Sequence, residues 1–265
     1  MNCAYRNVLI FVLVFVPGII IGGMFVAIWP FSDYGKVNYN RPQDLPGAGR
    51  AGAIYILSTL ATTSIEEVAA SAPQTRLWFQ LYFKNDTTFN ANLLTRAENS
   101  GYEAVVLTLD AQIIGKRVDQ LRHGFELPEN ASLANFDSNM NQNSTDSGTI
   151  LNQTLKVLRD DITMTWDVVK WIRDHTEMKL ILKGILTGED AKLAADYGVD
   201  AIIIDALSEV VSATASSGME IYLDGGISLG TDVFKAIALG AKMVLQTKTK
   251  IFVDSLQVYI FNFET

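Results

Sequence analysis

Several short apolar stretches of this sequence end in polar residues that could together form a binding site. They offer hydroxyl, amide, ammonium, carboxylate and bare backbone N–H groups, a set that suits a flat heteroaromatic ligand with a phosphate tail. The residues are Ser58, Gln80, Tyr82, Thr108, Asp110, Lys183, Asp224, Gly225 and Gly226. A shared site requires a fold in which these stretches end side by side.

Lys183 is the most informative of these residues because it closes the apolar stretch "LILKG". An ammonium group without a partner is costly in such surroundings, so a bound anion or a partner charge is expected beside it. The alternative is a lysine that reaches solvent along its own aliphatic stem.

Two further features could bind anions. The run "DGG" at residues 224–226 precedes a helix pattern, and open glycine backbone near a helix N-terminus favours phosphate; a simple tight turn is the alternative. Arg117, in "IIGKRVDQLRHGFELP", could bind a carboxylate through two parallel hydrogen bonds. A solvated surface arginine would show the same pattern.

An alternation of strand and helix patterns positions these residues. Apolar, β-branched stretches predict seven strands, nearly all followed by helix patterns, of which two start at the caps Ser64 (with Glu67, a capping box) and Thr187. This alternation indicates a parallel sheet, and its closed form is a TIM-type (β/α)8 barrel with the site at the carboxyl ends of the strands. The barrel is predicted to be incomplete, with the missing strand expected before Ala53. The strand ranges are 53–59, 76–83, 102–110, 179–184, 199–205, 219–226 and 242–247.

Two connections depart from this regular alternation. Residues 111–161 form a long polar stretch that includes "NMNQNSTDSGT", and a stretch of that length is usually functional or disordered. In contrast, only Asp205 separates the strand pattern ending at Ile204 from the helix pattern that begins at Ala206. The second connection therefore has almost no loop, although the loops after the strands usually contain the active-site residues of such folds.

Composition narrows the class of protein. The chain has 265 residues and a net charge of -8, without a basic run or stripe, so nucleic acid is not expected as a partner. The single cysteine, Cys3, excludes an internal disulfide and a cysteine-based metal cluster. Only His123 and His175 are available as histidines.

A long uncharged apolar segment lies near the N-terminus. It covers residues 8–29, which is long enough for a membrane span of about 20 residues. A cleavable signal sequence and a buried core helix are the alternatives. The expected organisation is therefore an apolar segment and linker at residues 1–48, a barrel at 49–247 and a divergent tail at 248–265.

The motifs of the barrel region, in order, closely resemble the FMN-dependent α-hydroxy acid oxidase family, which includes glycolate oxidase and lactate-oxidising flavoproteins. The resemblance covers roughly residues 49–244. It is carried by the motifs "YILSTLATTSIEEVA", "WFQLY", "AVVLTLDAQIIGKRVDQLRHGFELP", "MTWDVVKWIR", "LKGILTGEDAKLAADYGVDAIII" and "LDGGISLGTDVFKAIALGAK".

The resemblance implies a role for each matching position. Lys183 resembles the lysine beside flavin N1, and Asp110 the acid that orients a catalytic histidine. Tyr82 and Arg117 resemble the residues that bind the substrate's hydroxyl and carboxylate. The positions that resemble cofactor contacts are Ser58, Gln80, Thr108, Lys183, Asp224, Gly225, Gly226 and Ser228.

The sequence departs from the family at several positions. The family places a loop of the form S-N-H-G-x-R-Q after the strand that corresponds to residues 199–204, and this loop contains the base histidine and an arginine. Here Ile204 joins Asp205 directly. The first barrel strand and the phosphate-binding arginines of the family are also not recognisable.

Two functional hypotheses follow. The first is an oxidoreductase that uses FMN to oxidise a small 2-hydroxy acid of the glycolate or lactate class and reduces molecular oxygen to hydrogen peroxide. The second is an inactive, membrane-anchored protein, or a splice or partial product, that retains a flavin-binding scaffold. Localisation is membrane-associated if residues 8–29 form a span, and otherwise cytoplasmic or peroxisomal by resemblance, although no "SKL"-type address ends the chain. Barrels of this type often form homo-oligomers.

Overall fold

The structure is a computed structural model that describes residues 49, 53–111, 132–136, 164–227, 229–247 and 258–262. Arg117, His123, Ser228 and the apolar segment at 8–29 lie outside these residues. In the part that is described, no helix is long and apolar enough to cross a membrane.

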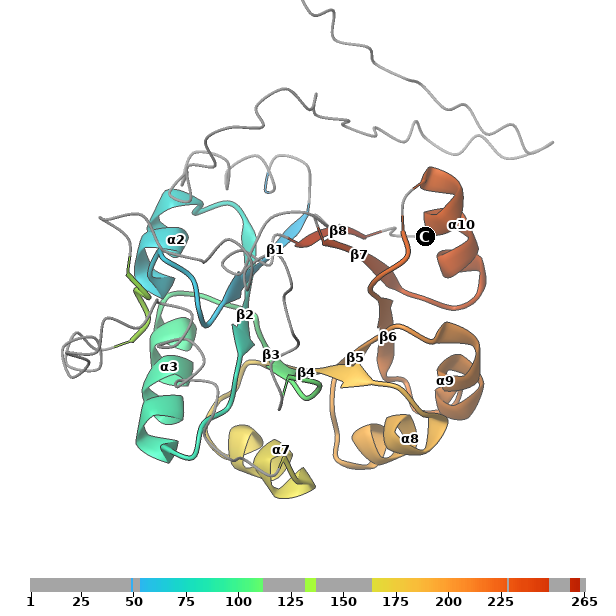
Figure 1. Ribbon diagram of the computed structural model, residues 1–265, viewed down its shortest axis with the longest axis horizontal. Coiled ribbons are helices and arrows are strands. Elements are labelled where there is room, and N and C mark those ends of the chain that lie inside the picture. The colour runs from blue at the N-terminus through green and yellow to red at the C-terminus, as the bar shows by residue number, and fades with distance from the viewer. Residues whose placement is uncertain are drawn as a thin grey trace, which may run out of the picture. The chain divides into compact units, whose positions relative to one another are not determined.

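Eight strands form a closed barrel in which neighbours along the chain are neighbours in the sheet (Figure 1). From β1 to β7 each strand pairs in parallel with the next, so the prediction of seven parallel strands is confirmed. The strands are β1 (Ile54–Ser58), β2 (Arg76–Leu81), β3 (Ala104–Thr108), β4 (Lys179–Ile185), β5 (Ala201–Ile204), β6 (Glu220–Leu223), β7 (Met243–Thr247) and β8 (Val258–Asn262).

The sequence predicted a barrel that lacks one strand, at the position before Ala53, and the seven parallel strands agree with this. The ring is completed from elsewhere, because β8 comes from the segment expected to be a divergent tail and pairs antiparallel with both β7 and β1. Five residue pairs join β8 to β7 from Met243↔Asn262 onward, whereas Ile54↔Ile260 is the one pair that joins it to β1. The stretch "VYIFN" has the aromatic and β-branched residues that favour strands, and it covers edges that β1 and β7 would otherwise expose.

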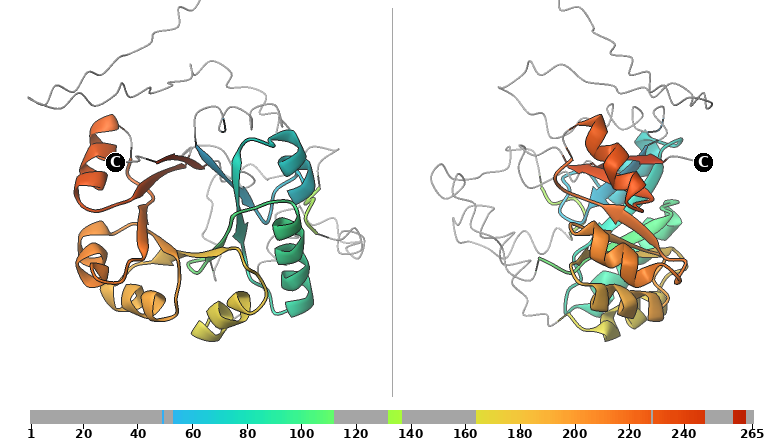
Figure 2. Two further views of the ribbon diagram at one scale, coloured as in Figure 1. Left: turned by 180° about the vertical axis from the view of Figure 1, so that it is seen from behind. Right: turned by 90° about the vertical axis from the view of Figure 1, so that its right-hand side faces the viewer.

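Helices surround the ring of strands on its outer side (Figures 1 and 2). Each of the strands β1, β2, β4, β5 and β6 is followed directly by one helix, and α7 leads into β4. The helices are α2 (Ile65–Ser71), α3 (Thr87–Asn99), α7 (Trp166–Arg173), α8 (Gly188–Asp196), α9 (Leu207–Thr214) and α10 (Gly230–Ala238).

Side-chain capping explains where several helices begin. Ser64 and Glu67 form the predicted capping box at α2, and the Thr187 side chain accepts a hydrogen bond from the Asp190 N–H at α8. At α3 the structure adds a cap that sequence reasoning missed, since Asp86 accepts from the Phe89 N–H and the helix starts two residues before Phe89. These bonds satisfy N–H groups that have no partner inside the helix.

The alternation of side chains along the strands produces two apolar layers. One set of alternate residues fills the barrel interior, and the other packs outward against the helices. The inner cluster comprises Ile54, Ile56, Trp78, Ala104, Val106, Ile181, Ala201, Ile203, Tyr222, Met243 and Leu245. The outer layer is larger and includes Leu57, Phe79, Leu107, Leu180 and Ile202.

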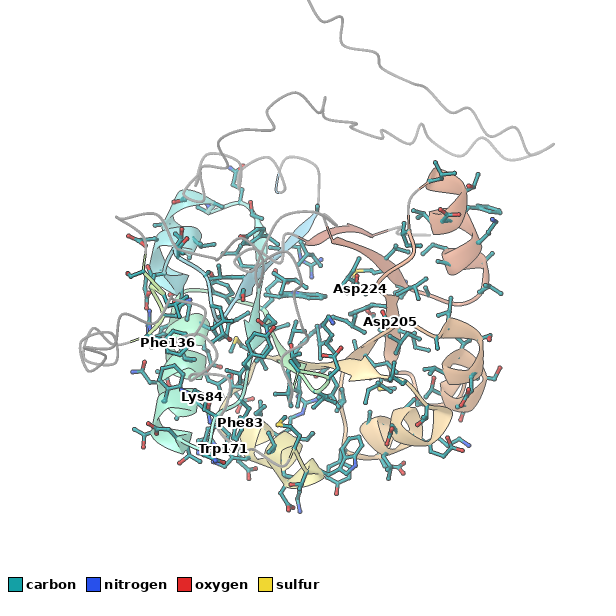
Figure 3. All side chains as sticks on the ribbon, viewed as in Figure 1. Phe83, Lys84, Phe136, Trp171, Asp205 and Asp224 are labelled. Carbon is teal, nitrogen blue, oxygen red and sulfur yellow. The ribbon has the colours of Figure 1, made fainter. Side chains whose placement is uncertain are left out.

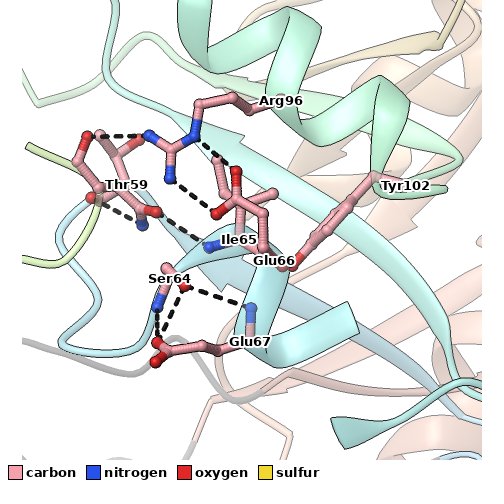
Figure 4. Close-up of polar contacts among 8 residues, drawn as sticks. Thr59, Ser64, Ile65, Glu66, Glu67, Arg96 and Tyr102 are labelled. Carbon is pink, nitrogen blue, oxygen red and sulfur yellow. Dashed lines mark hydrogen bonds and ion pairs between the residues drawn. The ribbon is translucent and has the colours of Figure 1, made fainter. Parts of the chain in front are cut away.

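A short segment of the long polar stretch packs on the barrel. Leu133 and Phe136 form a small apolar cluster with Leu60. The Asn135 side chain accepts from the Ile65 N–H at 3.0 Å, and its backbone carbonyl accepts from Arg96 (Figure 4). Residues 132–136 are therefore an ordered part of the fold.

We predict that Phe79→Ala lowers the free energy of unfolding by about 3–5 kcal/mol, the usual cost of removing a buried phenyl group. Phe79 is fully buried and packs edge-on against Tyr102 with ring centroids 6.3 Å apart. Chemical denaturation followed by circular dichroism measures the change. The control is Leu193→Ala, at an exposed position of α8, which should change stability by less than about 0.5 kcal/mol. Equal effects of the two variants would contradict the assignment of Phe79 to the core.

Candidate functional site

A layer of polar side chains follows the inner apolar cluster toward the carboxyl ends of the strands. Each of these residues is two positions beyond an inward residue of its own strand. Because strand side chains alternate with a period of two, all of them share the inward phase. They are Ser58, Gln80, Thr108, Lys183, Asp205 and Asp224. The structure thus brings together residues that are far apart in the sequence.

Gln80 connects three neighbouring positions of this layer. Its amide Nε2 donates to Thr108 Oγ1 at 2.8 Å, and its Oε1 accepts from Ser58 Oγ at 3.3 Å and from the Thr59 N–H at 3.3 Å. Ser58 Oγ in turn accepts from the Leu60 N–H at 3.1 Å. All of these groups are buried, so the hydrogen bonds hold their positions and satisfy polar atoms that water does not reach.

Lys183 extends its ammonium group between two carboxylates. Its Nζ lies 3.7 Å from Asp110 Oδ2 and 3.9 Å from Asp224 Oδ2, with the lysine side chain 18% exposed. The partner charge expected from the sequence is therefore present. The attraction of these two carboxylates offsets the partial removal of the lysine charge from water.

Gly184 allows Asp110 to approach this lysine. The glycine has a φ of 103°, and a Cβ added there would lie 2.9 Å from both Cβ and Cγ of Asp110. The Leu109 N–H also donates to the Lys183 carbonyl at 2.8 Å, and the pairing of β4 with β5 shifts register between Lys183 and Ile185. A side chain at position 184 would strain the backbone and displace Asp110.

Asp205 is a member of the site that the sequence-based list of site residues did not include. It follows β5 directly and lies near Asp224 (Figure 3). A Cβ on Gly225 would be 3.3 Å from Asp205 Oδ1. Burial raises the pKa of the Asp205 carboxyl; Lys183 opposes the rise, and Asp224 and Asp110 add to it. The signal that could have identified Asp205 is its phase, two residues beyond the inward Ile203.

The turn after β6 has open backbone at its two glycines. Gly225 and Gly226 have φ values of 79° and 69°, which glycine adopts without strain. The Gly225 N–H donates to Asp224 Oδ1 at 2.9 Å, and among the described residues no heavy atom lies within 4 Å of a Cβ placed on Gly226. The tight turn and the accessible backbone are thus both present, and three residues separate Gly226 from the start of α10.

The remaining predicted residues divide into two groups. Tyr82 is partly buried beside the cluster of Leu60, Leu133 and Phe136, at the end of β2, whereas Arg117 and Ser228 lie outside the described residues. His175 precedes the amino end of β4, away from this layer, and stacks on Trp171 with ring centroids 3.8 Å apart. Within the described residues, no group of His, Cys, Asp or Glu could hold a metal ion.

Comparison with known proteins agrees with this fold and site. The family of FMN-dependent dehydrogenases matches residues 44–253. Mouse 2-hydroxyacid oxidase 1 is 37% identical over 213 residues, which cover 73% of this chain and 57% of the relative. Glycolate oxidase 1 of Oryza sativa subsp. japonica is 39% identical over 224 residues, covering 77% and 59%.

Solved structures give the same result. Mandelate oxidase with (S)-2-phenylpropionate has a TM-score of 0.62 and 36% identity, covering 76% of this chain and 58% of that chain. A mutant of mandelate oxidase with (S)-mandelic acid has a TM-score of 0.63, with the same identity and coverage. The chain spans less than two thirds of the length of these relatives.

A barrel with a polar layer at the carboxyl ends of its seven parallel strands is the arrangement typical of TIM-barrel proteins. This chain belongs to the FMN-dependent dehydrogenase family. The cofactor of that family is FMN, and the donors present fit it: an amide, hydroxyls and an ammonium group suit the carbonyls and nitrogens of a flavin ring. The open backbone at Gly225 and Gly226 suits its phosphate.

We predict that Gln80→Leu lowers the free energy of unfolding by about 1–3 kcal/mol, because it leaves buried partners on Thr108 and Thr59 unpaired. Thermal and urea unfolding measure the loss. Gln74→Leu at an exposed position is the matched control and should change stability by less than about 0.5 kcal/mol. Wild-type stability in Gln80→Leu would contradict the buried network.

We predict that Asp205→Asn raises Tm at neutral pH. Since the folded-state pKa of Asp205 lies above the ordinary value of 3.8, folding favours the protonated carboxyl, and the ionised form is destabilising at pH values above the raised pKa. The gain in Tm of Asp205→Asn over the wild type should decrease as the pH falls through that raised pKa toward 3.8. Differential scanning fluorimetry from pH 4 to 8 measures it, with Asp196→Asn on the surface of α8 as the control. A difference in Tm between Asp205→Asn and the wild type that does not change with pH would contradict the raised pKa of Asp205.

Proposed function

We propose that this protein oxidises a small 2-hydroxy acid, of the glycolate or lactate class, to the 2-oxo acid, with FMN as the electron acceptor and molecular oxygen as the final oxidant. The observation that supports this most directly is the position of Lys183 in the polar layer, beside the Gln80–Thr108 pair, in a chain of the FMN-dependent dehydrogenase family. The relatives include proteins named 2-hydroxyacid oxidase and glycolate oxidase.

The residues of the polar layer have distinct proposed roles. Ser58, Gln80 and Thr108 would contact the edge of the flavin ring. Lys183 would stabilise the negative charge that develops beside it on reduction, as preorganised charges do in enzyme sites. Bound there, FMN would supply a two-electron acceptor for the α-hydrogen of the substrate.

Further residues would bind the phosphate and the substrate. The run from Asp224 to Gly226, with Ser228, would begin the phosphate loop. Tyr82 and Arg117 would bind the hydroxyl and carboxylate of the acid. Asp110 would be an acidic partner of Lys183, whose ammonium group it contacts at 3.7 Å.

A second candidate function is a flavin-binding scaffold without turnover. It is favoured by the connection between β5 and α9, where only Asp205 and Ala206 lie, and by the lack of a histidine in the polar layer among the residues that the structure describes. The domain limits at 48 and 247, membrane contact through residues 8–29 and self-association stay predictions of the sequence.

The two functions are separated by one experiment. The purified full chain is loaded with FMN, and glycolate, lactate or mandelate is added without oxygen. Loss of the oxidised-flavin absorbance supports the oxidase, whereas bound flavin that stays oxidised with every acid supports the scaffold. Hydrogen peroxide released after oxygen is admitted identifies the final oxidant.

We predict that Lys183→Met slows flavin reduction by about 10²–10³-fold, the usual effect of removing one charge-stabilising donor. Stopped-flow absorbance measures the rate constant at saturating acid. Lys192→Met removes the same charge from an exposed position of α8 and should leave the rate unchanged. Equal rates in the two variants would contradict the role of Lys183.

A further inference from the structure

The reaction proposed above needs a group that removes the hydroxyl proton of the substrate. General bases in enzymes are most often histidines or carboxylates. The one histidine among the described residues, His175, stacks on Trp171 before the amino end of β4. The titratable groups that face the polar layer are instead Lys183 and the carboxyls of Asp110, Asp205 and Asp224.

These carboxyl groups differ in what they already bind. Asp110 contacts Lys183 at 3.7 Å, and Asp224 contacts Lys183 at 3.9 Å and accepts the Gly225 N–H. For Asp205, no hydrogen bond or ion pair with another described residue is found. Its lone pairs are therefore open to a bound molecule.

The position of Asp205 along the chain also places it on the side of β5 that faces the site. It lies two residues beyond the inward Ile203, which places it in the inward phase of β5. Its Oδ1 approaches the backbone of the turn after β6, 3.3 Å from where a Cβ on Gly225 would be. Asp205 is the first of the two residues that connect β5 to α9, so its backbone position is fixed closely by the strand before it and the helix after it.

We propose that Asp205 is the general base of this protein and accepts the proton of the substrate's α-hydroxyl group. This inference rests on the proposed oxidase function. The O–H bond of the substrate breaks and its proton passes to Asp205 Oδ; the C–H bond breaks and its hydrogen leaves with both electrons to FMN; and the carbon–oxygen double bond forms. The acid loses two electrons and two protons in total, and oxygen takes them up to give hydrogen peroxide.

The surrounding charges support a carboxylate in this role. Burial raises the pKa of Asp205, Lys183 lowers it, and Asp224 and Asp110 raise it. A bound 2-hydroxy acid adds another negative charge, which raises the pKa of Asp205 further and increases its affinity for the proton. The ionised carboxylate is the form of Asp205 that can accept this proton.

The decisive experiment compares Asp205→Asn with the wild type in anaerobic flavin reduction between pH 4 and 9, using lactate and mandelate. The amide cannot accept a proton, so the rate constant should fall by about 10²–10⁴-fold, with unchanged FMN affinity in a fluorescence titration. The wild-type rate should decrease as the pH falls through the pKa of Asp205, and Asp205→Glu should keep that decrease. Asp196→Asn, at an exposed site on α8, is the matched control.

A decrease of less than tenfold in Asp205→Asn overturns the proposal and leaves the oxidase function intact. A wild type that binds FMN but is reduced by no acid overturns the oxidase function itself, and with it the role of Asp205. Carboxyl ¹³C NMR of the protein without FMN gives a readout besides activity. The signal absent from Asp205→Asn should titrate above 3.8, and titration at or below that value overturns the proposal.

Discussion

The ammonium group of Lys183 sets the requirements for the rest of the site. It projects into the polar layer with 18% of its side chain exposed, so its charge needs partners that water does not supply. Asp110 and Asp224 provide them from the ends of β3 and β6, on either side of β4 and β5. A closed barrel is the condition for this arrangement, because only curvature brings the ends of these strands around one cation.

The same charges explain why Asp205 differs from its neighbours. Lys183 already has two carboxylate contacts, so a further carboxylate nearby experiences like charges as well as the cation. The pKa of Asp205 is therefore raised, whereas a carboxyl held only by a cation would have a lowered pKa. Groups whose proton affinity is shifted in this way are frequent at functional sites.

Closure of the barrel depends on a strand of unusual direction. The carboxyl-end layer requires β1, β2 and β3 to stay side by side, since Gln80 on β2 bonds both Ser58 on β1 and Thr108 on β3. β8 completes the ring from the opposite direction, with extensive pairing to β7 and a single pair to β1. The seam between β1 and β8 is therefore the most weakly paired junction in the ring.

Local patterns in the sequence determined the alternation of strands and helices and the caps at Ser64 and Thr187. They also determined the inward phase of Ser58, Gln80, Thr108 and Lys183. Each of these features depends on residues within a few positions of one another. The tertiary structure decided the rest. β8, the packing of Asn135 over α2 and the partners of Lys183 depend on contacts between segments tens of residues apart. The importance of Asp205 arises in the same way, since its proton affinity is set by burial and by charges on β3, β4 and β6 that no local pattern displays.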